Sequence, residues 1–416
     1  DGTFEHGLFT AAVLLNAMPL LSLSPAPGER LQLPAPPVRL PRGCGCLPLL
    51  AVSLPRHGGL SIAGWDTQHL DIAPPDARER QQHWMRALGC DTAQAHPVPD
   101  EVLGLRLPRG TLHRAARAVQ ATSSSLDPSA WMPTLVAQLE AQGRFALDGI
   151  ARRMPDVLPA ETLALPLEAQ DEFDALVTRC RHRDALAEAL PAAFGHASGV
   201  RALFKGPSGT GKTLAARHLA AALGRPLYRV DLAATVSKYI GETERNLERV
   251  FEAAESLDIV LLLDEGDALL AGRTQVSNAT DRYANHETNY LLQRLEHYSG
   301  VLVVTTNAAD RIDTAFARRM DVTLDFPLPD ALTRLALWQA HLGDAGAAGA
   351  LDRCADLERV ALRCALSGGQ IRNAALHATL LALDKDGAIG PQELRLALER
   401  EYRKAGQQCP SLDEVF

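Results

Sequence analysis

The sequence of 416 residues contains no pair of cysteines separated by two residues, and its cysteines and histidines do not have the spacing of a zinc site. The seven cysteines are an odd number, which is unusual for a disulfide framework. We therefore expect reduced thiols, a cytoplasmic location and no structural zinc.

Long hydrophobic runs are also lacking. The apolar run at residues 11–23 spans 13 residues and is interrupted by Asn16 and Pro19, so it is too short to cross a bilayer. Asp1 and Glu5 precede it, where a signal peptide carries positive charge. We expect no membrane partner. Because the first residue is Asp rather than Met, we also expect the natural N-terminus to lie outside this sequence.

The chain has no excess of positive charge. It carries 42 Lys and Arg against 50 Asp and Glu, for a net charge of -8. A broad basic face for duplex nucleic acid is therefore unlikely, although a local basic channel would be compatible with this average. With 46% apolar and 22% charged residues, the composition is that of a soluble globular protein, and the length indicates roughly two to four domains.

The sequence does contain a glycine-rich turn between an apolar run at residues 202–204 and a helix-period pattern that ends at Gly224. In such a turn, backbone N–H groups at a helix N-terminus bind phosphate, a lysine neutralises the terminal phosphates and a hydroxyl ligates magnesium. The alternative is a simple turn that caps a helix. We predict a site for ATP and Mg²⁺ formed by Gly206, Pro207, Ser208, Gly209, Thr210, Gly211, Lys212 and Thr213.

An acidic pair follows a second apolar run. Residues 259–263 are all aliphatic, as in a parallel strand buried on both faces, and Asp264 and Glu265 come directly after them. We expect Asp264 to hold hydrated magnesium and Glu265 to orient and deprotonate the attacking water. Solvated turn residues are the alternative interpretation.

Two further motifs follow in order. Residues 301–306 form another apolar strand that leads into Asn307, and a segment at residues 310–321 contains the adjacent arginines Arg318 and Arg319. With these motifs, the sequence from Leu163 to about Lys404 resembles the AAA branch of the AAA+ ATPases. The resemblance implies that Asn307 is sensor 1, which positions water near the γ-phosphate. It also implies that Arg318 or Arg319 reaches the ATP site of a neighbouring subunit. The family separates its two arginines by two residues, whereas here they are adjacent, so either could act.

The same resemblance assigns a role to Lys238, Tyr239 and Ile240, which precede Gly241. They occupy the position of pore loop 1, whose aromatic residue grips an extended polypeptide through apolar and stacking contacts. Tyr239 as a half-buried turn residue is the alternative. The chain contains no HExxH motif, which disfavours the membrane-tethered AAA proteases that carry a metal site in the same polypeptide.

Part of the sequence occurs twice. Residues 69–89 match residues 323–343 at nine of 21 positions with an offset of 254, and residues 107–116 match residues 366–375 with an offset of 259. Two matched blocks in one order indicate a duplicated helical lid. At the offset of 254, the acidic pair falls on Thr10 and Ala11, so we expect the first copy to be a degenerate AAA-like module without catalytic residues.

We therefore predict an α/β fold, with a phosphate-loop sheet and a helical lid preceded by a degenerate partial module. The expected parts are a first module at 1–153 with a lid-like region at about 66–150, a linker at 154–167, a large ATPase subdomain at 168–326 and a lid at 327–416. The closest resemblance is to bacterial valosin-containing-protein-like ATPases. It implies a hexameric ring that remodels, unfolds or translocates protein substrates. Alternatives are a nucleotide-controlled assembly scaffold, for example for a phage-tail-like injection system, and a nucleic-acid-directed motor.

Overall fold

The structure is a computed structural model. It describes residues 20–22, 30–32, 51–53, 59–61, 75, 77–88, 105–107, 109–122, 134, 135, 137, 147, 149–158, 163–189, 199–230, 242–267, 290–308, 312, 314–342, 353–385 and 389–412. The chain divides into two units, residues 1–74 with 237–246, and residues 75–236 with 247–416. In the first unit, β1 (Leu20–Ser22) pairs in parallel with β3 (Ala51–Ser53), and β2 (Arg30–Gln32) pairs in parallel with β4 (Gly59–Ser61).

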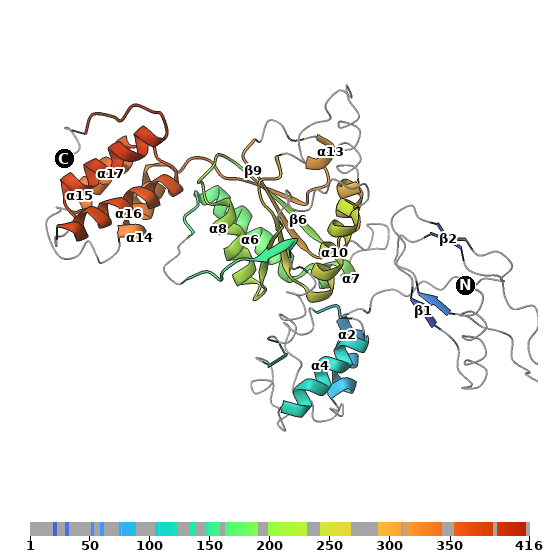
Figure 1. Cartoon of the computed structure of the whole chain (residues 1–416). Helices are drawn as coiled ribbons and strands as arrows, with labels where there is room; N and C mark the ends of the chain where they lie inside the picture. The colour runs from blue at the N-terminus through green and yellow to red at the C-terminus, as the bar shows by residue number, and fades with distance from the viewer. Residues whose placement is uncertain are drawn as a thin grey trace, which may run out of the picture. The chain divides into compact units, whose positions relative to one another are not determined.

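A six-stranded sheet forms the centre of the second unit (Figure 1). Its order is β10-β6-β9-β8-β7-β5, and every pairing is parallel except that of β5 with β7. The strands are β5 (Ala151–Arg153), β6 (Val200–Lys205), β7 (Leu227–Val230), β8 (Val260–Leu263), β9 (Val301–Thr306) and β10 (Val322–Asp325). The predicted α/β fold with a phosphate-loop sheet is confirmed.

Helices cover both faces of this sheet (Figure 1). Helices α6 (Leu167–Arg181) and α8 (Lys212–Ala222) pack on one face, and α10 (Glu242–Leu257) and α13 (Thr314–Ala317) pack on the other. Every residue of β8 and β9 is buried, because alternate side chains enter the two hydrophobic cores. The continuous aliphatic runs in the sequence follow from this burial. Helix α6 buries four residues on one face, Phe173, Leu176, Val177 and Cys180.

The edge strand β5 differs from the expectation. The sequence analysis assigns residues 151–153 to the first module, but they pair antiparallel with β7, with Arg152 opposite Arg229. The backbone N–H of Met154 then donates to the carbonyl of Leu227 at 2.8 Å. The six-stranded sheet therefore begins before the expected linker, because β5 covers an edge of β7 that would otherwise remain unpaired.

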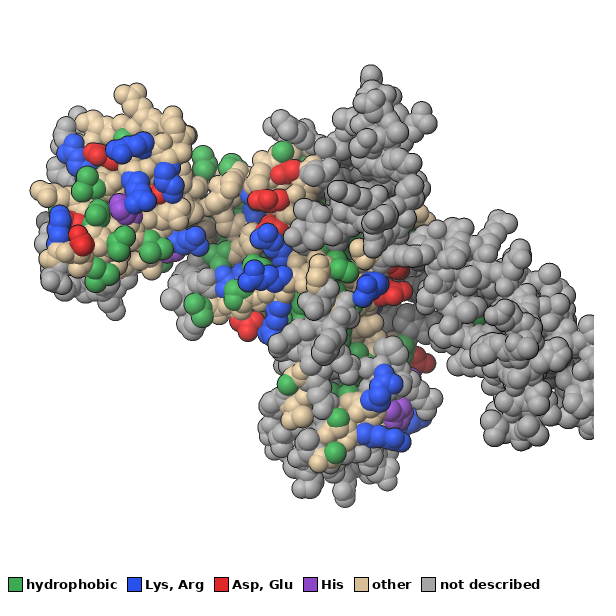
Figure 2. Space-filling model, viewed as in Figure 1, with side chains coloured by type: hydrophobic (Ala, Val, Ile, Leu, Met, Phe, Trp, Pro, Cys, Tyr) green, Lys and Arg blue, Asp and Glu red, His purple; other side chains and the backbone are tan. Residues whose placement is uncertain are grey.

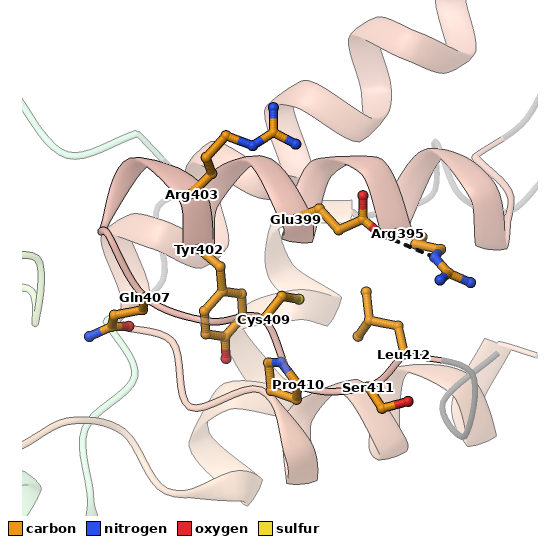
Figure 3. A pocket seen from close by; sticks show the side chains of 9 residues that line it. All are labelled: Arg395, Glu399, Tyr402, Arg403, Gln407, Cys409, Pro410, Ser411 and Leu412. Carbon is orange, nitrogen blue, oxygen red and sulfur yellow. Dashed lines mark hydrogen bonds and ion pairs between the residues drawn. The ribbon is translucent and has the colours of Figure 1, made fainter.

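A helical lid follows β10. It consists of α14 (Ala331–Leu342), α15 (Arg353–Arg363), α16 (Gly368–Asp384) and α17 (Pro391–Lys404), which enclose a core around Trp338. Ser367 caps α16 and exchanges hydrogen bonds with Gln370 in a capping box. The chain after α17 turns back along it and leaves a hollow of about 420 Å³ beside Arg395, Tyr402 and Cys409 (Figure 3).

A smaller helical pair packs on the subdomain that contains the six-stranded sheet. Helices α2 (Ala77–Leu88) and α4 (Arg109–Thr122) share a core with Leu135 and contact Leu257 at the end of α10. In the sequence repeat, five buried residues of this helical pair match five buried residues of α14–α17. The matching pairs are Trp84 and Trp338, Leu107 and Leu366, Leu112 and Ile371, Ala115 and Ala374, and Ala116 and Ala375. One polar contact is repeated as well. Arg80 donates to the carbonyl of Pro75, and Arg334 donates to that of Pro329.

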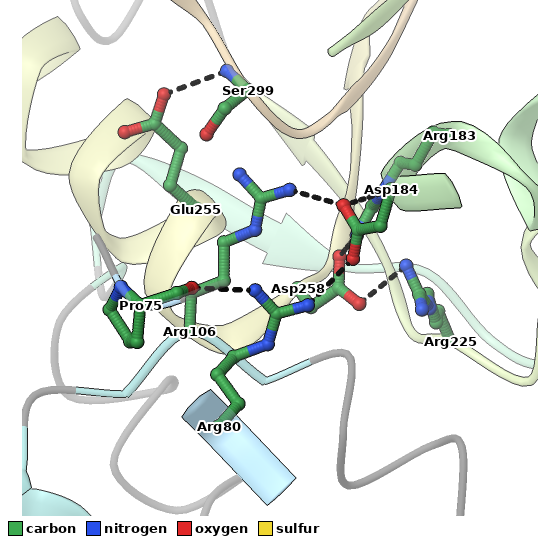
Figure 4. Close-up of polar contacts among 9 residues, drawn as sticks. All are labelled: Pro75, Arg80, Arg106, Arg183, Asp184, Arg225, Glu255, Asp258 and Ser299. Atoms are coloured by element: carbon green, nitrogen blue, oxygen red, sulfur yellow. Dashed lines mark hydrogen bonds and ion pairs between the residues drawn. The ribbon is translucent and has the colours of Figure 1, made fainter. Parts of the chain in front are cut away.

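A cluster of arginines and aspartates joins this helical pair to α7 (Arg183–Ala189) and to the start of β8 (Figure 4). Arg80 and Arg106 both bind Asp184, at 2.8 and 2.7 Å. Burial would raise the pKa of Asp184, but the neighbouring Arg106, Arg183 and Arg80 outweigh it and hold that pKa below its usual range. The side chain of Asp258 is only 3% exposed, and it pairs with Arg183 and Arg225.

None of the described helices is both long and apolar enough to span a lipid bilayer.

We expect Asp258→Asn to destabilise the subdomain that contains the six-stranded sheet by about 3 kcal/mol, because it removes the carboxylate charge that Arg183 and Arg225 share in the interior. Urea-induced unfolding followed by circular dichroism measures the effect. The control is Asp156→Asn, which removes the same charge from an exposed pair with Arg153 and should change stability by less than about 0.5 kcal/mol. Equal unfolding midpoints for the two variants would show that the buried cluster contributes no more than a surface pair.

Candidate nucleotide site

The predicted phosphate-binding and acidic residues converge at one edge of the sheet. Strands β6, β9 and β8 are neighbours and parallel, so their carboxyl ends lie side by side. The phosphate loop follows β6, Asp264 and Glu265 follow β8, and Asn307 follows β9. Ligands of open α/β sheets bind outside this edge, where the loops between strands and helices can contact them.

The phosphate loop needs its glycines for physical reasons. Gly206 has a φ of 150°, and a Cβ at this position would lie 2.1 Å from the carbonyl oxygen of Phe326. Gly211 has a φ of 100° and immediately precedes α8. L side chains are strained in this left-handed region, so glycine permits the tight turn that directs backbone N–H groups toward a phosphate at the start of α8.

Lys212 is anchored within the site and is 7% exposed. Its Nζ donates to the carbonyl oxygens of Gly206 and Pro207, both at 2.7 Å, and to Oδ1 of Asn307 at 2.8 Å. Burial lowers the pKa of Lys212 below its usual value, while Asp264, Asp267 and Glu265 oppose that shift. The structure therefore brings the predicted lysine and the predicted sensor asparagine into direct contact.

Asp264 connects three segments of the site. Its Oδ1 accepts hydrogen bonds from the hydroxyls of Thr305 at 2.6 Å and Thr213 at 3.3 Å. Its Oδ2 lies 3.3 Å from Nη1 of Arg229 on β7. Carboxylate and hydroxyl oxygens are ligands that Mg²⁺ prefers, and here Asp264 and Thr213 are adjacent, so these residues fit the predicted metal.

Glu265 is exposed at the same edge and has a φ of 53°, which is uncommon for a residue with a side chain. Its backbone N–H donates to the hydroxyl of Thr305 at 3.0 Å, and the N–H of Gly266 donates to the carbonyl of Thr305 at 3.0 Å. Strain of this kind persists where neighbouring contacts hold it in place. These bonds fix the backbone from which a general base could reach water.

The sequence analysis did not identify Asp267, which organises the segment that carries Asn307. Its carboxylate accepts hydrogen bonds from the hydroxyl of Thr306 and from the backbone N–H groups of Asn307 and Ala308. The available signal was a third acidic residue close behind the Asp-Glu pair. The contribution of Thr305, which binds both Asp264 and Glu265, had no comparable signal because it depends on the pairing of β8 with β9.

The remaining predicted residues lie elsewhere. Arg319 forms an ion pair with Glu296 at 2.6 Å, whereas Arg318 is exposed, and no ion pair to it occurs among the described residues. The predicted pore-loop residues Lys238, Tyr239 and Ile240 lie outside the part of the chain that the structure describes. The lid reaches the phosphate loop, since the N–H of Gly369 donates to the carbonyl of Gly209 at 2.8 Å.

We expect Asp267→Ala to reduce ATP hydrolysis by about ten- to a hundredfold, because the segment carrying Asn307 loses three hydrogen bonds and moves out of position. Nucleotide affinity, measured with a fluorescent ADP analogue, should change by less than about threefold because no predicted phosphate contact is removed. Asp325→Ala is the control. It removes an exposed carboxylate that pairs with Lys205, and it should hydrolyse ATP like the parent. An unchanged rate in Asp267→Ala would contradict the assignment.

Comparison with known proteins agrees with this geometry. Residues 202–328 match the family model described as "ATPase family associated with various cellular activities (AAA)". The uncharacterized AAA family ATPase y4kL of Sinorhizobium fredii is 40% identical over 131 residues, which cover 31% of this chain and 39% of the relative. The 26S proteasome subunit RPT4 of Saccharomyces cerevisiae is 30% identical over 206 residues, or 48% of this chain and 46% of the relative.

A third relative extends further along the chain. The ATP-dependent zinc metalloprotease FtsH 3 of Sphaerobacter thermophilus is 28% identical over 303 residues, which cover 70% of this chain and 58% of the relative. The chain thus spans about half the length of these relatives. The matched region contains the phosphate loop, Asp264, Glu265, Asn307 and both arginines. Residues 202–328 are thus similar to the ATPase domain of the AAA family.

Proposed function

We propose that this protein hydrolyses ATP and uses the energy to remodel or unfold protein substrates as an oligomeric ring. The observation that carries the proposal is the meeting of Lys212, Asp264, Glu265 and Asn307 at the carboxyl edge of the sheet. These residues combine a charge for the terminal phosphates, a metal-holding carboxylate, an exposed base and a polar amide. This combination suits the transfer of a phosphoryl group to water.

Each residue then has a defined task. The loop N–H groups and Lys212 bind the phosphates of ATP, and Thr213 and Asp264 hold Mg²⁺. When bound, the metal ion supplies positive charge to the phosphate oxygens and orients them. Glu265 accepts a proton from the attacking water as its oxygen bonds to the terminal phosphorus and the bond to ADP breaks. Asn307 positions that water.

A ring is supported by apolar and charged groups on the surface. Leu376, Leu380 and Leu383 of α16 are 65%, 60% and 68% exposed at helical spacing, and Figure 2 shows hydrophobic side chains among basic ones on the lid. Leu167 of the ATPase subdomain is 78% exposed. The apolar patch on α16 favours association with a neighbouring copy, for which we propose a head-to-tail ring of six subunits. Arg318 is the better candidate for the neighbouring ATP site, because Glu296 already binds Arg319.

Protein as the substrate class is supported by the names of relatives. They include 26S proteasome subunits, a proteasome-activating nucleotidase and an ATP-dependent zinc metalloprotease. Lys238, Tyr239 and Ile240 would line the central channel and grip an extended polypeptide.

The helical pair of α2 and α4 is proposed to be the lid of a degenerate first module, as in valosin-containing-protein-like bacterial ATPases. The matched buried positions and the repeated contact of Arg80 and Arg334 with a proline carbonyl support this assignment. Its proposed role is assembly or recruitment of a partner, because the predicted catalytic residues have no equivalents at the matching offset.

We expect Glu265→Gln to slow ATP hydrolysis at least about a hundredfold while ATP binding is retained, because the amide cannot accept the proton from water. Phosphate release measures the rate, and light scattering with ATP reports the mass of the assembly. The control Glu168→Gln changes an exposed residue of α6 and should match the parent. Hydrolysis by Glu265→Gln at the parent rate would contradict the proposed mechanism.

We expect Tyr239→Ala to abolish unfolding of a fluorescent reporter protein that carries an unstructured tail, while ATP hydrolysis stays within about threefold of the parent. Tyr239→Phe keeps the aromatic ring and should retain unfolding. If Tyr239→Ala remains fully active, the alternative of an assembly scaffold that threads nothing is the better description.

A further inference from the structure

Arg229 stands out because its side chain contacts the carboxylate predicted to hold magnesium. It lies on β7, where its Cα pairs with that of Leu262 on the adjacent β8. Leu262 and Asp264 are two residues apart, so the strand directs both side chains to the same face of the sheet as Arg229. This register brings Nη1 of Arg229 within 3.3 Å of Oδ2 of Asp264.

The two carboxylate oxygens of Asp264 have different partners. Oδ1 accepts hydrogen bonds from Thr305 and Thr213, which are neutral groups that belong to the phosphate-loop and sensor segments. Oδ2 faces the positive charge of Arg229. A divalent cation near Oδ2 would therefore meet a guanidinium group of the same sign within a few ångströms, and the two cannot share that oxygen without strong repulsion.

The ion pair between Arg229 and Asp264 can break at a small cost in free energy. The side chain of Arg229 is 52% exposed, whereas that of Asp264 is 12% exposed. An ion pair in which one partner is largely solvated contributes little free energy, and the long arginine side chain can swing away at small cost. Arg152 on β5 lies opposite Arg229, and like charges in this position disfavour each other. The ion pair with Asp264 therefore stabilises Arg229 weakly enough to be displaced.

We propose that Arg229 competes with the divalent cation for Asp264, so that the cation binds efficiently only when nucleotide phosphates add their negative charge to the site. Arg229 is thus a regulatory residue for metal entry. The inference rests on the proposed ATP site for the place of the metal, but it concerns binding and can be measured without turnover.

The test uses the full chain and Mn²⁺, whose free concentration is followed by electron paramagnetic resonance without nucleotide, where the competition should be strongest, and then with ADP. Arg229→Gln should lower the Kd for Mn²⁺ by about three- to fivefold, the range expected for loss of a weak ion pair. Arg229→Lys retains a cation and should stay closer to the parent. Thermal melting of each variant checks that the fold is intact.

The matched control is Arg152→Gln, which removes the same charge at the register partner of Arg229 on β5. It should leave the Kd for Mn²⁺ within about 1.5-fold of the parent, since Arg152 forms no ion pair with Asp264 among the described residues. Equal tightening in both variants would show a long-range field instead of competition and would overturn the inference. An unchanged or weaker affinity in Arg229→Gln would overturn it as well.

Asp264→Asn separates this inference from the proposed function. If it loses Mn²⁺ binding while Arg229→Gln binds like the parent, the metal site stands and the competition is refuted. If Asp264→Asn binds Mn²⁺ as the parent does, the metal is not held at Asp264, and both the proposed metal site and the inference fail.

Discussion

The carboxylate of Asp264 is the contact on which the ATP site depends. Through Thr305 it is fixed to β9, through Thr213 to the start of α8, and through its own backbone to β8. Three segments that are distant in sequence thereby share one acceptor oxygen. Because parallel strands end at a common edge, a short side chain suffices to connect them, and the positions of Lys212 and Asn307 follow from that connection.

Two aspartates flank strand β8, and they differ in burial and in their partners. Asp258 comes before the strand, is 3% exposed and pairs with two arginines in the interior. Asp264 comes after it and is held by hydroxyl groups and one exposed arginine. A buried carboxylate with charged partners cannot exchange them at low cost, so Asp258 suits a structural junction. A partly accessible carboxylate with weakly bound partners suits the exchange of ligands.

The two copies of the repeated segment have matching core residues but contact different parts of the chain. Trp84 and Trp338 are buried in matching positions. The first helix of each copy also carries an arginine that donates to a proline carbonyl. In the lid, Arg334 also donates to Ala361, within the same helical unit. In the first copy, Arg80 instead binds Asp184 of the ATPase subdomain. The same local packing thus occurs in a helical unit that contacts Gly209 and in a helical pair that is attached through Asp184.

The sequence by itself determined the phosphate loop, the acidic pair and the three strands that lead into the loop, Asp264 and Asn307, because these features depend on local spacing and on burial that repeats along the chain. It could not determine that Thr305 and Asp267 organise the site, that residues 151–153 complete the sheet, or that Arg229 contacts Asp264. Each of these contacts arises from the register between strands that are far apart in sequence. Only the tertiary structure sets that register, because it is the packing of two hydrophobic cores that aligns the strands.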